Sequence, residues 1–136
     1  AMIDTQAGES SLASQRAVTS ADEIARSIAA VRTVHVAEAV KRYVVDLVTA
    51  TRRSPELRLG ASPRATIHLI RAARARAAVD GHDYVVPDDV QALAVPVLAH
   101  RLLLTAEAQI ARHTSADVVA QTVRSVPTPG PDLSHR

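Results

Sequence analysis

The stretch that decides the fold is residues 36–52, VAEAVKRYVVDLVTATR. Its apolar residues recur three and four positions apart, which is the spacing of one helix face; they are Val36, Val40, Tyr43, Val44, Leu47 and Val48. The other face is charged, and Glu38 and Arg42 stand four residues apart in the order that favours an ion pair. β-Branched residues are frequent, but the spacing predicts a helix over 36–52.

Helix signals flank this stretch on both sides. Upstream, Ser20 and Glu23 form a capping-box pattern, which predicts a helix over about 21–32 with Ile24, Ile28 and Val31 at helical spacing. Downstream, residues 53–61 contain Pro55 and Gly60 and are expected to form a loop. A serine N-cap at Ser62 and a proline at the first helical position predict a further helix over 63–79, which ends at Asp80-Gly81.

The C-terminal third predicts shorter elements. Residues 84–86 are expected to be briefly extended, and residues 101–104 fit either strand or coil. Pro87 starts a helix that Pro96 is expected to kink or end. Thr105 caps a short helix to about 111, and Ser115 caps a last one over 116–124. The residues expected to face the core are Val90, Leu93, Val97 and Leu98, then Val118, Val119, Thr122 and Val123.

The predicted fold is therefore an all-α bundle of five or six helices over residues 20–126. Residues 1–19 are expected to be a linker that begins with a cloning remnant, and the proline-rich residues 127–136 a disordered tail. The 136 residues include no Phe or Trp and two Tyr, so the core must be filled by Val, Leu, Ile and Ala. Small side chains let helices approach closely, which favours helix-on-helix packing.

Several kinds of function are disfavoured. Cysteine is absent, and the net charge is only +2, so broad electrostatic binding of nucleic acid is not indicated. No apolar run approaches the roughly 20 residues of a membrane helix, and no signal peptide is recognisable, so a cytoplasmic location is expected. Phosphate-loop and HExxH motifs are missing, and no two of the six histidines are three or four residues apart. Asp88 and Asp89 are adjacent, so on a helix they point apart and act as helix-start charges.

Arg64 breaks a local rule. As the second residue of its helix, it places a cation at the positive end of the helix dipole. A helical wheel predicts that Ile67, Ile70, Ala73 and Ala77 are buried and that Arg64 lies on another side, with His68 and Arg71. A free guanidinium beside first-turn amides suits an anion such as phosphate. The alternative is an arginine paired with Glu56 or another acidic neighbour, or simply solvated.

The segment LRLGASPRA, residues 57–65, resembles the sensor-2 segment of MoxR-family AAA+ ATPases. The resemblance extends over about residues 20–126, through YVVDLVTATR at 43–52, GHDYVVPDDV at 81–90 and VLAHRLLL at 97–104. It implies the helical C-terminal lid of that family. Val86 departs from the pattern, because the family more often has a capping Thr there.

The resemblance implies a chaperone-like parent that hydrolyses ATP with Mg²⁺, held by an upstream AAA+ core. Arg64 would be the sensor-2 arginine at the γ-phosphate, with Gly60, Ala61, Ser62 and Pro63 shaping the turn. It further implies homo-oligomeric, commonly hexameric, rings and clients with von Willebrand factor A domains. The chain alone is expected to be inactive and to bind neither nucleotide nor metal.

Two other functions remain open at this stage. One is a helical nucleic-acid-binding module, supported by Arg71, Arg74 and Arg76 with Arg52, Arg53 and Arg58 before them, although a wheel spreads the first three over more than one side. The other is a protein-interaction module without a nucleotide role.

Overall fold

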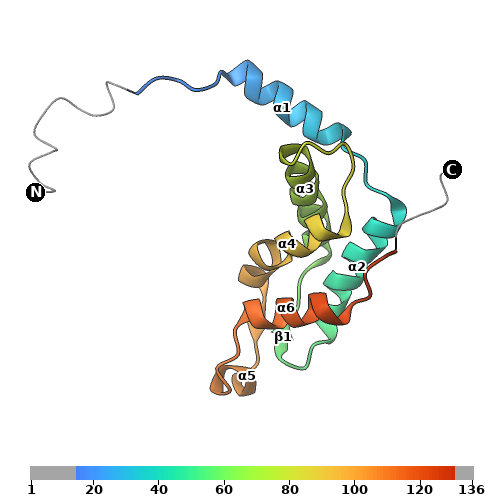
Figure 1. The fold of residues 1–136 in the computed structure, drawn as a ribbon. Coiled ribbons are helices and arrows are strands. Elements are labelled where there is room, and N and C mark those ends of the chain that lie inside the picture. Colours follow the sequence, from blue (N-terminus) through green and yellow to red (C-terminus); the bar gives the residue numbers. More distant parts are fainter. Residues whose placement is uncertain (1–14, 131–136) are drawn as a thin grey trace, which may run out of the picture.

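The computed structural model describes residues 15–130, and that part is almost wholly helical (Figure 1). In chain order the elements are α1 (Ala21–Thr33), α2 (Glu38–Arg53), β1 (Leu57–Leu59), α3 (Pro63–Val79), α4 (Pro87–Leu98), the 3₁₀ helix η2 (Ala99–Arg101), β2 (Leu103–Leu104), α5 (Ala106–Ile110) and α6 (Ser115–Ser125). The all-α prediction is confirmed. Residues 15–19 and 127–130 have no regular structure, and the predictions for 1–14 and 131–136 lie outside the described residues.

The core forms where α2, α3, α4 and α6 meet. Every residue predicted for the apolar face of residues 36–52 is buried. In α4 and α6 the most buried residues are Val90, Ala94, Leu98, Val118 and Val119, whereas Leu93, Val97 and Val123 are only partly buried against them. On the charged face of α2, Glu38 pairs with Lys41 at 3.3 Å, and not with Arg42 as its position predicted.

The buried stripe of α3 differs from the predicted one. It consists of Ala65, Leu69, Ala73 and Ala77, whereas Ile67 is 53% exposed and Ile70 is only partly buried. The wheel was wrong because it favoured the larger apolar residues. Alanines without bulk let α3 approach its neighbours closely, and α4 covers more of α3 than any other element does.

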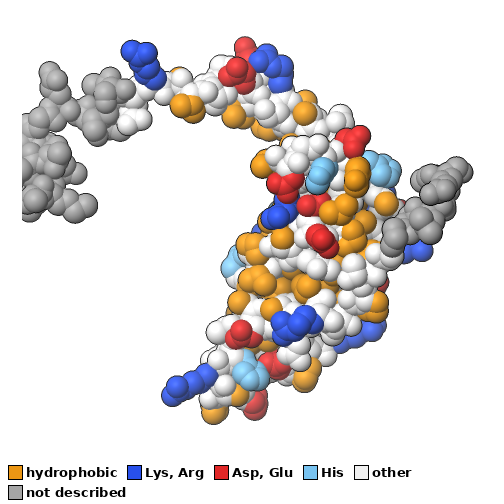
Figure 2. All heavy atoms as spheres, in the orientation of Figure 1, with side chains coloured by type: hydrophobic (Ala, Val, Ile, Leu, Met, Phe, Trp, Pro, Cys, Tyr) orange, Lys and Arg blue, Asp and Glu red, His pale blue; other side chains and the backbone are white. Residues whose placement is uncertain are grey.

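α1 projects beyond the bundle and packs against α3 (Figure 1). The predicted capping box is confirmed, since the Ser20 hydroxyl accepts from the Glu23 N–H and the Glu23 carboxylate accepts from the Ser20 N–H. No residue of α1 is buried, and Ile24 and Ile28 are about half exposed. Figure 2 shows hydrophobic side chains at the surface along α1. The apolar residues that recur at helical spacing in α1 therefore lie on a surface helix and not in the core.

Residues 53–61, predicted as a loop, contain β1, which pairs antiparallel with β2. Leu57 lies opposite Leu104 and Leu59 opposite Leu103, so the unassigned residues 101–104 are extended at their end. Pro96 does not end α4 at once, because the helix continues to Leu98 and then tightens into η2. The extended piece at 84–86 is confirmed, since Val85 N–H donates to the carbonyl of His35 at 2.9 Å.

Two acidic residues near helix starts make hydrogen bonds that the sequence did not predict. The N-cap of α6 is Thr114, one residue before the predicted Ser115, and it forms a capping box with Asp117. At α4, Val86 supplies no side-chain cap, but the Asp89 carboxylate accepts from the Val86 N–H at 2.9 Å. Asp89 is buried and its other oxygen lies 3.5 Å from Nε of Arg76, so it is more than a solvated helix-start charge.

The Thr114 cap predicts a pH effect. Hydrogen bonds from the hydroxyl and the backbone N–H of Thr114 hold the pKa of Asp117 below its usual value of 3.8. Because the folded-state pKa is lowered, the ionised carboxylate stabilises α6 above the unfolded-state pKa, and that contribution is lost as the pH falls through the folded-state pKa. We expect Thr114→Val to raise the pKa of Asp117 in an NMR titration, whereas Thr33→Val in α1 leaves it unchanged. An unaltered Asp117 titration in Thr114→Val would contradict this.

Gly60 predicts a packing effect. An added Cβ would lie 2.7 Å from Cα of Arg52 and 2.8 Å from both N of Arg52 and O of Thr51. These are backbone atoms of α2 and cannot swing aside, so we expect Gly60→Ala to lower the free energy of unfolding by about 1–3 kcal/mol. The free energy of unfolding of this variant and of its control is measured by urea titration. Gly130→Ala is the control, because nothing lies within 4 Å of its added Cβ, and equal stability of the two variants would count against the packing argument.

Candidate functional site

Arg64 lies on the outside of the bundle, as predicted. It is the second residue of α3, after the N-cap Ser62 and Pro63, and its side chain is exposed. At 100° per residue it stands about 160° from the middle of the buried stripe of α3, so the true stripe turns Arg64 further outward than the predicted one did. None of the ion pairs between described residues includes Arg64.

The turn before Arg64 is fastened to the last turn of α2. The Thr51 hydroxyl accepts from the N–H of Ala61 at 3.0 Å and donates to the carbonyl of Val48 at 2.7 Å. Nε of Arg52 donates to the carbonyl of Ala61 at 2.8 Å. Ala61 is thus held at both of its backbone polar groups while its side chain is buried. This arrangement fixes where the backbone enters α3 and therefore fixes the backbone position of Arg64.

Sequence reasoning gave Gly60, Ala61, Ser62 and Pro63 the role of shaping the turn before Arg64. In the structure, residues 60–62 connect β1 to α3 without regular secondary structure, and Pro63 is the first residue of α3. Sequence reasoning missed Thr51 and Arg52 as the residues that hold that turn. A signal for Thr51 was present, because it continues the apolar face of α2 by one more turn after Leu47 and Val48 and is fully buried. A hydroxyl on such a face needs a partner. Nothing in the sequence indicated the partner of Arg52, since Ala61 lies nine residues away.

The first turn of α3 is left without a side-chain cap. Ser62 has the extended backbone of an N-cap, but its hydroxyl makes no capping hydrogen bond. Pro63 has no N–H, and the N–H of Ala65 donates to the carbonyl of Ser62 at 2.9 Å. The positive end of the α3 dipole and the Arg64 guanidinium therefore stand together at the surface without an acidic side chain in the first turn.

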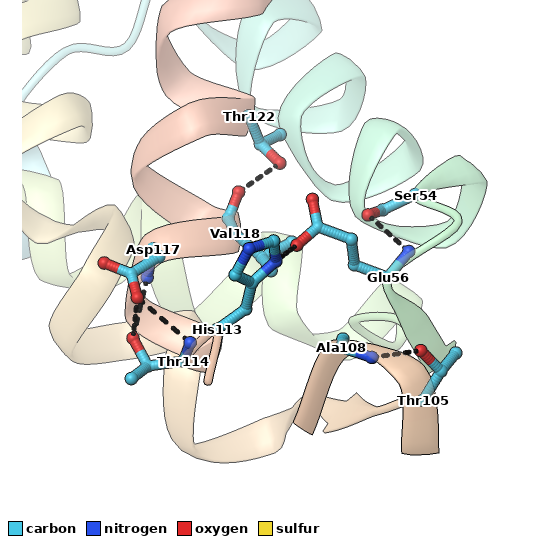
Figure 3. Close-up of polar contacts among 9 residues, drawn as sticks. All are labelled: Ser54, Glu56, Thr105, Ala108, His113, Thr114, Asp117, Val118 and Thr122. Atoms are coloured by element: carbon cyan, nitrogen blue, oxygen red, sulfur yellow. Dashed lines mark hydrogen bonds and ion pairs between the residues drawn. The ribbon is translucent and has the colours of Figure 1, made fainter. Parts of the chain in front are cut away.

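Glu56, the acidic neighbour considered for Arg64, is used elsewhere. Its carboxylate contacts Nδ1 of His113, on the connection between α5 and α6 (Figure 3). The same region is held by Thr114 with Asp117, and by the Thr105 hydroxyl, which accepts from the N–H of Ala108 (Figure 3). The carbonyl of Glu56 also accepts from the N–H of Thr105 at 2.9 Å. Glu56 thus ties β1 to the α5–α6 region, and Arg64 keeps no ion pair with it.

The basic residues of α3 do not form one face. Arg71 and Arg74 line a hollow against α1, together with Ile24, Ile28 and Val31. Arg76 lies near two carboxylates, 3.6 Å from Asp80 and 3.5 Å from Asp89. Arg71 and Arg74 thus share one hollow, whereas Arg76 lies beside carboxylates, so the three arginines of α3 do not form one free basic face.

Residues 15–130 include no group of three or more His, Asp or Glu side chains that could hold a metal ion. Within the same described residues, no helix is both long and apolar enough to cross a membrane.

The comparisons with known proteins agree on one family. The family model described as the AAA lid domain matches residues 49–122, which include α3, α4 and the turn at Gly60. A candidate ATPase of Cytophaga hutchinsonii, known from a crystal structure, has 31% sequence identity and a TM-score of 0.71 over 79% of this chain and 34% of its own.

Curated relatives point to a narrower group. Chaperone MoxR1 of Mycobacterium tuberculosis is 42% identical over 72% of this chain and 28% of its own length. The uncharacterized protein YeaC of Bacillus subtilis is 38% identical over 73% of this chain and 31% of its own length. Protein MoxR of Paracoccus denitrificans is 40% identical over 52% of this chain and 25% of its own length. The chain thus spans less than a third of the length of each of these relatives. It belongs to the AAA lid domain family, as a lid of the MoxR-like AAA+ ATPases.

Proposed function

We propose that this chain is the lid that packs over bound ATP in a longer AAA+ ATPase and that Arg64 is its sensor-2 contact to the γ-phosphate. The observation that carries the proposal is an outward guanidinium at the start of α3, on a fastened turn, with no acidic partner among the described residues. A cation that opposes the helix dipole is unfavourable unless an anion joins it.

The residues present fit a phosphate group. The planar guanidinium of Arg64 can donate two parallel hydrogen bonds to phosphate oxygens, and the uncapped first turn of α3 adds a favourable dipole. The described residues hold no metal cluster, so Mg²⁺ and the rest of the phosphate cradle would be supplied by the other part of the longer protein. The role of the lid itself is to bind the terminal phosphate and to change position when that phosphate is lost.

The packing explains how this contact would be transmitted. α3 is covered by α4 and contacts α2, so a force on Arg64 acts on the bundle as a whole. With the γ-phosphate present, Arg64 gains a charge-assisted bond and the lid closes; after hydrolysis and phosphate loss the lid relaxes relative to the core and the neighbouring subunit.

The proposal includes the assembly around the lid. The partners are an upstream AAA+ core on the same chain, neighbouring subunits of a homo-oligomeric, hexameric ring in the cytoplasm, and client proteins with von Willebrand factor A domains. A relative named as a chaperone supports a client-directed role.

The test is Arg64→Ala in the full-length ATPase. We expect ATP turnover to fall about 100- to 1000-fold, because a contact to developing negative charge is lost. The control is Arg26→Ala, which removes an exposed arginine from α1 and should leave turnover unchanged.

The unfolding midpoint of Arg64→Ala should not fall below that of the unmodified protein, because Arg64 is exposed and its cation opposes the α3 dipole. Unchanged turnover in this variant, with turnover of Arg26→Ala also unchanged, would rule out the sensor-2 role.

A further inference from the structure

Beside the turn at Gly60 lies a hollow of about 600 Å³ that Arg64 does not line. Three arginines from separate elements line it: Arg52 at the end of α2, Arg58 in β1 and Arg101 at the end of η2. The remaining lining comes from residues 59–63, and none of it is acidic. The three arginines are called here the arginine basin. Their positive charges are not neutralised by an acidic residue in the lining of the hollow.

Two of the three guanidiniums are held in place. Nε of Arg52 donates to the carbonyl of Ala61 at 2.8 Å, which leaves its terminal nitrogens free. Nε of Arg101 donates to Nε2 of His100 at 3.1 Å, and Nδ1 of His100 lies 3.2 Å from the carbonyl of Pro96. His100 in the tautomer protonated at Nδ1 satisfies both contacts and orients Arg101. No ion pair between described residues uses Arg52, Arg58 or Arg101.

We propose that the arginine basin is a second anion-binding site and that its ligand is a chain of phosphate groups. Three guanidiniums match the three to four negative charges of a triphosphate, and each can bind phosphate oxygens in the forked geometry that arginine favours. The phosphates could come from a nucleotide or from inorganic polyphosphate, which share this chemistry.

The basin is coupled to the turn that carries Arg64. Arg52 contributes one N–H to Ala61 and its remaining N–H groups to the basin, so a bound anion would hold Arg52 in the position that fastens the turn. It would also relieve the mutual repulsion of the three guanidiniums. A ligand in the basin therefore stiffens the entry to α3 without touching Arg64.

The test is an NMR titration of the 136-residue chain, which holds its own core, with sodium tripolyphosphate at low ionic strength. We expect the shifted amides to cluster at residues 58–62 and 100–101. Arg101→Gln should raise the Kd about 10-fold, the loss expected for one charge-assisted hydrogen bond. His100→Ala should raise it less, because Arg101 remains but is no longer oriented.

The matched control is Arg26→Gln, which makes the same change in net charge at an exposed position of α1. An equal rise in Kd in Arg26→Gln and Arg101→Gln, or shifts scattered over all surface arginines, would overturn the site. A glutamate peptide of the same charge that binds as tightly would overturn the phosphate ligand. ATP that shifts the same amides would identify a nucleotide source, and tripolyphosphate alone an inorganic one.

Failure here is separable from failure of the sensor-2 role. Arg64→Ala should leave tripolyphosphate binding in the basin intact, because Arg64 does not line it. Its effect on ATP turnover in the full-length protein is measured independently, so either proposal can fall while the other stands.

Discussion

The buried hydroxyl of Thr51 joins the last turn of α2 to the backbone that leads into α3, by donating to Val48 and accepting from Ala61. Removing it would leave a buried N–H without a partner, which costs about 1–3 kcal/mol. Arg52 secures the other side of Ala61, and Gly60 allows the two backbones to meet closely. The position of the start of α3, and therefore of Arg64, depends on this junction.

The lack of aromatic rings shapes the rest of the bundle. With no Phe or Trp, the core depends on close approach rather than on bulk, and α3 therefore presents Ala65, Ala73 and Ala77 to its neighbours. Ile67 stands about 140° from the middle of the buried stripe at 100° per residue, and it stays at the surface. Tyr43 is the exception, since its ring is buried and its hydroxyl accepts from Nε2 of Gln91 on α4.

The charges of the bundle are divided between structure and surface. Asp89, Asp117 and Glu56 serve the fold, through the start of α4, the start of α6 and the contact with His113. Arg64 and the arginine basin have no ion pair among the described residues, and Arg64 does not line the basin.

The sequence by itself determined those features that depend on interactions between residues close together in the chain. The capping box of Ser20 and Glu23, the Pro63 start, the Gly81 stop and the apolar face of α2 all depend on residues within a few positions of each other. Only the tertiary structure decided which face of α3 is buried, that Leu57 pairs with Leu104, and that Arg58 and Arg101 share one hollow. Those outcomes depend on how closely whole helices pack and on contacts between distant residues, which no local pattern encodes.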